Sequence, residues 1–564
     1  FGIVIAGAVL ISAFVALTLT PMMSARFLKP HTKENKFYHA TEPFFVWLNN
    51  LYSGSLDFFL KNRYLAFVIM VFALGAVFVI APMLPTELAP LEDRSALRVS
   101  ATTSEGTSYE YTSNFIDMLE DTVSAKIPER SVLISGVALG PAGGSNNSGF
   151  IRLMLSEPQD RKRSQMEISN YLAQATGKFS DARVFVLQDQ TIGTSRGGLP
   201  IQYVLLAPTL EKLKAVLPGF IEDARKDATF QQVDVNLKFS KPELVIDIDR
   251  AKARDAGVSV ADIAQTMQLL LSGQRYGYFV YEGKQYQIIG QVLKGGRATP
   301  EDVAGLFVKS RNGEMLRLDN FVKISEQGNS PQLYRYNRYV SATVSASLAP
   351  GKTIGDGITA MDVIAEKRLD ESFSTALSGA SKDFKESSSS LLFTFVLALV
   401  FIFLVLAAQF ESFRDPLIIM FTVPLALGGA FISLWLFDQT INVFSEIGMI
   451  MLIGLVTKNG ILIVEFANQK KEQGLPVKQA AREAALMRFR PILMTSLSTI
   501  LGSLPIALAL GAGSESRVSM GIVVVAGMSF STILTLYVIP ALYTFFSKDA
   551  KVEGKENKVT EVVV

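Results

Sequence analysis

Long apolar runs and one large polar block alternate along this chain of 564 residues. A helix that crosses a membrane needs about 20 mostly apolar residues, and seven runs have that length. They are Phe1 to Met23, Tyr64 to Leu84, Leu391 to Gln409, Pro416 to Phe437, Val443 to Ala467, Pro491 to Leu510 and Val518 to Phe545. The pattern predicts a membrane-embedded bundle of seven helices: one in 1–27, one in 64–84 after a connecting segment (28–63), and five in 386–546.

Between residues 85 and 385 the apolar runs shorten to the length of strands. In 85–199, alternating segments such as "ALRVSATT" and "RVFVLQ" read as strands, while "TSYE" (107–110) and "SQME" (164–167) read as capping boxes that begin helices. The predicted order is βαββαβ, which is a ferredoxin-like pattern. Residues 200–242 and 330–385 predict a second such unit, interrupted by an insertion at 243–329.

Composition excludes several classes of protein and site. The formal charge is only +2 and no basic face is visible, so nucleic-acid binding is not expected. The absence of cysteine excludes disulfides and thiolate sites, and the two histidines, His31 and His39, lie in a polar segment that does not suggest a metal site. The phosphate-loop-like "ASLAPGKT" lacks the first glycine, and no nucleophile motif occurs, so we expect neither an enzyme nor a cofactor.

Basic residues mark one side of the predicted bundle. They gather in the segments that join the first span to the second and the fifth to the sixth, and in the C-terminal tail, whereas the loops between them carry almost none. By the positive-inside rule these segments are cytoplasmic. The block at 85–385 is then expected on the other side, in the periplasm of a bacterium, and 547–564 is expected to form a disordered cytoplasmic tail.

Lys458 is a charged residue in the middle of an apolar run. About fifteen mostly apolar positions precede it in its run and about nine follow, which is too deep for a simple reach to the interface. An ammonium there costs about 3 kcal/mol or more unless it has a partner. Glu465 lies about 10 Å away along the axis, and no other predicted span has an acidic residue in its core. We therefore expect the partner carboxylate to lie outside this chain.

The next span carries further polar groups. Arg488 and Thr495 are seven residues apart and share a helix face. The Thr495 hydroxyl could join a proton relay or could bond back to its own helix, and periodicity alone does not decide between these.

Four segments resemble one transporter family. "ALTLTPMMSARFLKP", "IDIDRAKARDAGVSVADI", "GLVTKNGILIVEFANQ" and "RFRPILMTSLSTILGSLPIAL" are similar to the hydrophobe/amphiphile efflux (AcrB-type) branch of the resistance-nodulation-division (RND) superfamily, in order and along essentially the whole chain. The family has twelve spans in two repeats. The resemblance implies the C-terminal half of such a pump, beginning with the last span of the N-terminal half.

The same resemblance implies a function and a set of partners. The function is proton-driven export of drugs or amphiphiles by a secondary transporter of the bacterial inner membrane, with protons as the coupling ion. The two ferredoxin-like units would be porter subdomains, and the insertion would help a homotrimer to dock with a periplasmic adaptor and an outer-membrane channel. The residues implied for the proton relay are Lys458, Asn459, Arg488 and Thr495. Their acidic partner would lie in the N-terminal half.

One loop departs from the family pattern. Val137 and Leu139 stand where drug exporters often have Phe, and Arg152 lies near another aromatic position. The residues implied for the substrate pocket are Val137, Leu139, Gly140, Pro141, Phe150 and Arg152, and their character implies a smaller or more polar pocket. Two other functions stay open: a related component that translocates lipid or protein, and a membrane-anchored periplasmic sensor without transport.

Overall fold

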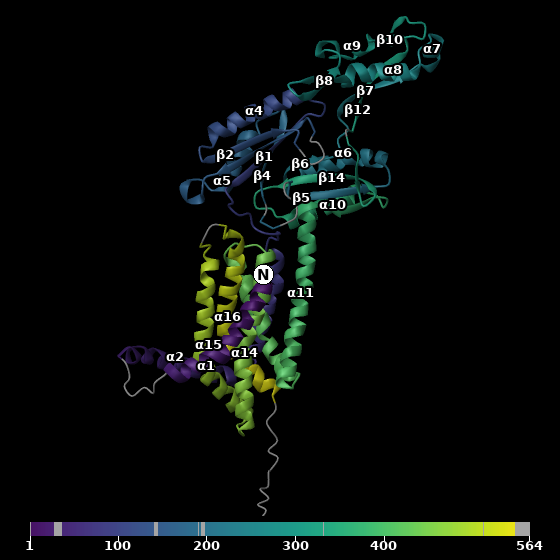
Figure 1. The fold of residues 1–564 in the computed structure, drawn as a ribbon. Helices are drawn as coiled ribbons and strands as arrows, with labels where there is room; N and C mark the ends of the chain where they lie inside the picture. The colour runs from purple at the N-terminus through teal and green to yellow at the C-terminus, as the bar shows by residue number, and fades with distance from the viewer. Residues whose placement is uncertain are drawn as a thin grey trace, which may run out of the picture.

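The computed structural model describes residues 2–27, 36–139, 145–189, 191–192, 198–330, 332–510 and 513–547, without the side chains of 36–41 and 389. The loop residues Gly140 and Pro141, His31, the side chain of His39 and all but the first residue of the tail predicted at 547–564 lie outside this part. In Figure 1 a helical bundle occupies one end of the molecule, two sheet units follow, and the insertion lies farthest from the bundle.

Six helical segments among the described residues are long and apolar enough to cross a membrane. They are α1 (Gly2–Phe27), α3 (Leu65–Ile80) with its short extension to Met83, α11 (Gly379–Phe410), α12 (Arg414–Met420) with α13 (Thr422–Leu436), α14 (Val443–Glu472), and α16 (Val518–Phe546) with the turn before it. The bundle thus has six such segments where the sequence pattern predicted seven spans.

The remaining predicted span lies in α15 (Val477–Ala507), which packs along α14 and α16. Its first half is polar, and its apolar part begins only after Arg490 and ends at Ala507, so α15 is not among these six segments. Where α15 ends, α16 comes very close. A Cβ atom on Gly521 would lie 2.3 Å from the backbone nitrogen of Ala507, so only glycine fits there.

Helix α2 (Lys36–Lys61) forms most of the predicted connecting segment and projects sideways at the lower end of the bundle in Figure 1. Tyr52 fixes it to the bundle: its hydroxyl donates to the Leu536 carbonyl at 2.6 Å, and its ring stacks on Phe489 with centroids 4.3 Å apart. Arg482 of α15 also donates to both carboxylate oxygens of Asp57. By contrast, α1 has no buried residue.

The first sheet unit has the element order βαββαβ. Its elements are β1 (Ala96–Thr103), α4 (Tyr109–Lys126), β2 (Arg130–Val137), β3 (Ser148–Leu155), α5 (Gln165–Thr176) and β4 (Ala182–Gln188), and the antiparallel strands lie in the order β2-β3-β1-β4. Val99, Ile151 and Leu153 are fully buried under the two helices. The predicted capping box of Ser164 and Glu167 is confirmed, but α4 is capped by Ser108, one residue after the predicted Thr107.

The second unit repeats this arrangement. Its elements are β5 (Ile201–Ala207), α6 (Leu210–Lys226), β6 (Phe230–Val235), β14 (Tyr339–Leu348), α10 (Ile354–Arg368) and β15 (Ser374–Leu377). Strand β14 pairs with β6 and β5, and β5 pairs with β15, which gives the order β6-β14-β5-β15. A short strand β13 (Tyr334–Tyr336) also pairs with β14. The boundary expected after residue 385 falls inside α11, which runs without a break from this unit into the bundle.

The insertion leaves and rejoins the second unit through two paired antiparallel strands, β7 (Lys241–Ile248) and β12 (Val322–Asn329). Between them lie α7 (Arg250–Asp255), α8 (Val260–Met267), β8 (Gln274–Tyr281), β9 (Lys284–Gly290), α9 (Pro300–Ala304), β10 (Phe307–Lys309) and β11 (Met315–Arg317). Ile263, Val308 and Leu318 form part of a small core of its own.

Candidate functional site

The first group of predicted site residues lies on α14. The helix begins at Val443 because the Asn442 side chain accepts hydrogen bonds from the backbone N–H groups of Phe444 and Ser445. One face of α14 is buried against α13, α15 and α16, while Gly454, Lys458 and Glu465 are exposed on another.

Lys458 lies on this uncovered face. Its side chain is exposed and forms no ion pair with any residue that the structure describes. Glu465 is also exposed and accepts a hydrogen bond from Gln469 at 3.0 Å. The geometry therefore leaves the ammonium without an acidic partner in the described part of the chain, although α14 is apolar and of membrane-spanning length.

Asn459 follows directly in sequence but points in a different direction. It is 1% exposed, and its Nδ2 donates to the Ser496 hydroxyl of α15 at 3.2 Å and to the Thr532 hydroxyl of α16 at 3.4 Å. Its Oδ1 is buried and has no hydrogen-bond partner among the described residues, which costs about 1–3 kcal/mol. Asn459 thus forms a polar junction of three helices, apart from the exposed face of Lys458.

Arg488 and Thr495 lie on α15. The guanidinium of Arg488 stacks over the Phe466 ring of α14 at 4.6 Å, and its Nε is buried without a partner within the described chain. The Thr495 hydroxyl donates to the Ile492 carbonyl at 3.1 Å, so the bond to its own helix is the one present here. Thr499 and Ser503 continue the same pattern further along α15, each bonding four residues back.

The four predicted relay residues therefore lie on two neighbouring helices, α14 and α15, but do not form one hydrogen-bonded chain. Sequence reasoning missed Ser496 and Thr532, which hold the Asn459 amide. Each is one of several hydroxyl residues in its helix, and only the contact with Asn459 distinguishes it from the others.

The second group of predicted site residues lies on the first sheet. Its face away from the helices carries Phe150 and Arg152, which alternate with the buried Ile151 and Leu153. Leu139 and the Phe150 ring both pack over Gly136, since a Cβ atom there would lie 2.6 Å from Leu139 Cδ1 and 3.3 Å from the ring. Leu139 is 68% exposed. Leu139, Phe150 and Arg152 thus share an open surface.

Val137 differs from them. It pairs with Gly149 on the helix-covered side and packs against the core of the unit, so the structure places it away from that open surface. Gly140 and Pro141 lie outside the described residues. Sequence reasoning missed Phe185 of β4, which shares the open face because Ser100 of β1 pairs with Phe150 on one side and Phe185 on the other.

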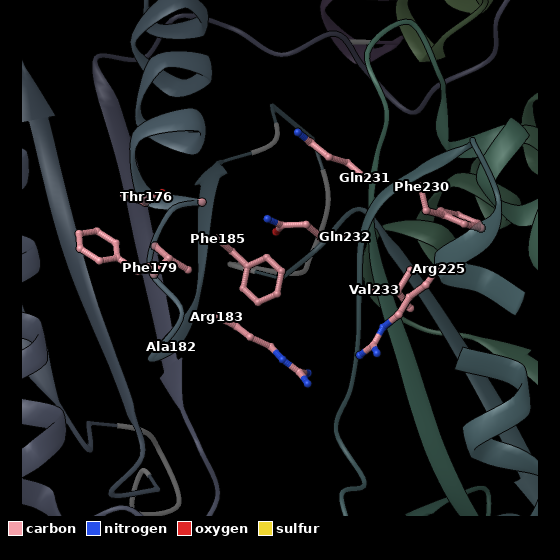
Figure 2. A pocket seen from close by; sticks show the side chains of 12 residues that line it. Thr176, Phe179, Ala182, Arg183, Phe185, Arg225, Phe230, Gln231, Gln232 and Val233 are labelled. Carbon is pink, nitrogen blue, oxygen red and sulfur yellow. The ribbon is translucent and has the colours of Figure 1, made fainter. Parts of the chain in front are cut away.

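Phe185 also lines a cavity of about 420 Å³ between the two sheet units, where the edge strand β4 faces the edge strand β6. Figure 2 shows Phe185, Arg183 and Gln232 projecting into the space between the strands. Arg225, at the end of α6, is exposed and lines the same cavity. The lining combines aromatic rings with guanidinium and amide groups, which suits molecules that have both apolar and polar parts.

Ion pairs join the two units beside this cavity. Arg183 of β4 pairs with Asp234 of β6. Asp234 also lies 3.5 Å from Lys238, and Lys238 lies 3.6 Å from Glu105 in the first unit. Except for Arg183, which is half-exposed, these side chains are less than a fifth exposed. They form a chain of alternating charges across the boundary, which we call the inter-unit latch: Glu105, Lys238, Asp234 and Arg183.

Comparison with known proteins identifies the family. The model of the AcrB/AcrD/AcrF family matches residues 1–547. The chain belongs to this family. It is 32% identical over 562 residues to an uncharacterized transporter from Haemophilus influenzae, covering 98% of this chain and 54% of that protein.

Pseudomonas putida has similar proteins with named activities. One is the multidrug/solvent efflux pump membrane transporter MepB, 31% identical over 99% of this chain and 54% of its own length. Another is the toluene efflux pump membrane transporter TtgB, 30% identical with the same coverage. The chain spans about half the length of the curated relatives it matches. The two Pseudomonas putida relatives are described as efflux pump membrane transporters, and the six apolar helical segments among the described residues of this chain are long enough for a multi-pass membrane protein.

Proposed function

We propose that this protein is the C-terminal half of a proton-driven RND exporter of amphiphilic molecules, in the inner membrane of a bacterium. Its helices would form seven spans, with α15 as the sixth, shielded by α14 and α16. The two sheet units would be ferredoxin-like porter subdomains in the periplasm. The insertion would serve docking within a homotrimer that joins a periplasmic adaptor and an outer-membrane channel.

One observation carries the proposal of proton coupling: Lys458 is exposed on an apolar helix and has no acidic partner among the described residues. A charge in that position is expensive unless a carboxylate meets it. We infer that the carboxylates lie on a helix of the N-terminal half, which would cover this face of α14. Protonation of those carboxylates would release Lys458, and the change in pairing would shift α14 against its neighbours.

The other relay residues would have distinct parts in this mechanism. The Arg488 guanidinium, held against the Phe466 ring, keeps a positive charge near the cytoplasmic end of the bundle. The Thr495 hydroxyl can exchange its bond to Ile492 for one to a neighbour when the helices move. Asn459 would tie the movement of α14 to α15 and α16 through Ser496 and Thr532.

Cargo would pass along the open face of the first sheet and through the cavity between the units. Phe150, Phe185 and Leu139 offer apolar contacts there, and Arg152 and Gln232 offer polar ones. Opening the cavity would require the inter-unit latch to break. The relatives that are named as solvent and toluene pumps support apolar or amphiphilic cargo.

The experiment replaces Lys458 with Ala and measures energy-dependent export of a fluorescent amphiphile from cells that carry the complete pump. We expect export to fall to background while the protein still assembles in the membrane, because the relay loses its only ammonium. Lys478→Ala is the matched control, since Lys478 is exposed in the first turn of α15. Unchanged export in the Lys458→Ala variant would overturn the mechanism, whereas no energy-dependent export even from cells with the parent protein would favour a sensor without transport.

A further inference from the structure

A second cavity lies at the boundary between the bundle and the second sheet unit. The segment after α3 forms one wall and is fixed to the start of α14 by backbone hydrogen bonds. Glu87 N–H donates to the Ile441 carbonyl at 3.0 Å, and Val443 N–H donates to the Leu88 carbonyl at 3.2 Å. The first turns of α11 form the opposite wall, including Phe384 and Leu392.

This boundary cavity has a volume of about 470 Å³ and adjoins an apolar pocket of about 240 Å³ deeper in the bundle. Leu392 and Glu446 line both, so the two spaces adjoin at these side chains, and we call the pair of cavities the slot. The inner pocket is lined by apolar side chains of α3, α11, α13 and α14, among them Val77, Phe395, Phe431 and Met449. Leu392 is 67% exposed on the outer surface of α11, so the slot opens to the side where lipid would lie.

The polar end of the slot carries two carboxylates. Glu446, in the first turn of α14, is partly buried and has neither a hydrogen bond nor an ion pair within the described residues. Glu87 accepts a hydrogen bond from the Thr440 hydroxyl at 2.6 Å, and burial raises the pKa of its carboxyl. Lys385 also lines the cavity, but its side chain is exposed, so water can solvate its ammonium.

An unpaired carboxylate at the end of an apolar slot favours one class of ligand. The slot can take an alkyl chain, and the carboxylate attracts a positive head group that enters with it. An anionic head group would be repelled by Glu446. A neutral one would gain the apolar contacts but leave the charge of Glu446 uncompensated.

We propose that this slot binds amphiphilic cations, with an alkylammonium head group against Glu446 and Glu87 and the alkyl chain between α3, α11 and α14. The inference rests on the proposed export of amphiphiles and names one charge class that the pump would accept. It also assigns a binding role to Glu446 and Glu87, which the relay does not use.

Photoaffinity labelling of the full chain in dodecyl maltoside micelles tests this site directly. The probe is a dodecyl chain with a diazirine and a trimethylammonium head group, and the comparison probe carries a neutral hydroxyl head group instead. We expect saturable labelling of Leu392, Met449 or their neighbours by the cationic probe. Glu446→Gln is expected to weaken its apparent affinity about tenfold, the effect of one partly buried charge pair, and to leave labelling by the neutral probe unchanged.

Two further variants keep the test decisive. Glu465→Gln removes a carboxylate from the exposed face at the other end of α14 and should leave labelling unchanged. Leu392→Lys places an ammonium at the mouth of the slot, near the start of the predicted span, where the lysine stem can carry the charge to the membrane surface, and should abolish saturable labelling by the cation. Equal affinity of the parent and Glu446→Gln proteins, or labelling spread evenly over the bundle, would overturn the site.

The same variants separate this inference from the proposed function. If Glu446→Gln cells still export an anionic amphiphile but labelling shows no dependence on Glu446, the slot is refuted and the exporter stands. If cells export nothing but labelling behaves as expected, the slot stands and the proposed function fails.

Discussion

Asp234 offers the sharpest test of how the two sheet units are held together. It is the central carboxylate of the inter-unit latch, paired with Arg183 across the cavity and 3.5 Å from Lys238. Replacing it with Asn leaves the shape of the side chain but removes the attraction for both cations. Lys238 keeps Glu105, 3.6 Å away, so the main loss is the direct link between β4 and β6.

The size of the effect follows from exposure. Arg183 is 50% exposed and Asp234 is 19% exposed, so solvent screens the pair and its net contribution is about 1 kcal/mol. That corresponds to about a fivefold change in the ratio of closed to open arrangements. Because Arg183 acts through the same pair, Arg183→Gln should have a similar effect, and the double variant should add little to either one.

The chain contains no cysteine, so spin labels can be placed without background. We expect labels at Lys178→Cys and Gln231→Cys, two exposed positions on opposite sides of the cavity, to show a longer and broader distance distribution in Asp234→Asn. The exchanged pair, Arg183→Asp with Asp234→Arg, should restore the parent distribution. The matched control is Asp223→Asn, which breaks a pair with Arg368 inside the second unit.

Two results would refute this reasoning. The first is a distance distribution in Asp234→Asn that is the same as in the parent protein. The second is full additivity of Arg183→Gln and Asp234→Asn, since two residues that act through one pair must show coupling.

Two further predictions concern stability. Burial alone would raise the pKa of Asp93, but hydrogen bonds from Arg161, Gln165 N–H and Ser95 N–H outweigh it and hold that pKa below its usual value. The ionised Asp93 carboxylate therefore adds to the free energy of unfolding at neutral pH, and this stabilisation is lost as the pH falls through the folded-state pKa. Asp93→Asn should lower the free energy of unfolding by about 3 kcal/mol at pH 7, because the 1% exposed Arg161 loses its carboxylate partner. The stabilities of the variant and the parent protein, measured by unfolding at several pH values, should converge in acid. A difference that stays constant with pH would contradict this. Gly521→Ala should lower the free energy of unfolding by about 1–3 kcal/mol, because the added methyl group pushes α16 away from the end of α15. Thermal unfolding measures this against the control Gly502→Ala, where the added methyl group meets no atom within 4 Å. Equal melting temperatures of the two variants would contradict the prediction.

Periodicity and caps predicted most elements because these signals are local. The strands β1 and β4 and the capping box of Ser164 with Glu167 depend only on neighbours in sequence. The misplaced cap of α4 shows the limit of that logic. Thr107 and Ser108 are both good caps, and Thr107 instead bonds the Thr103 hydroxyl, a contact set by the end of β1.

The candidate site was less predictable, since its residues depend on which faces meet. An unpaired Lys458 could be expected because its own helix offers no near carboxylate. The inward position of Val137 depends on the register of β2 with β3, and the Asn459 junction depends on where α15 and α16 cross α14. The pairing of Arg183 with Asp234 joins residues that are 51 positions apart in different units, which no local pattern reveals.

Helix α11 gives the molecule a stiff lever. Its 32 residues make a rod about 48 Å long, and its first turn is anchored to β5 because Ser381 is fully buried, donates to the Pro200 carbonyl and accepts from Gln202 N–H. Because α11 is continuous from Gly379 to Phe410, a tilt of about 10° about one end of this rod would move the other end by about 8 Å. If the proposed exporter works as described, a small rearrangement among its membrane helices would thereby become a displacement comparable to the width of a transported molecule.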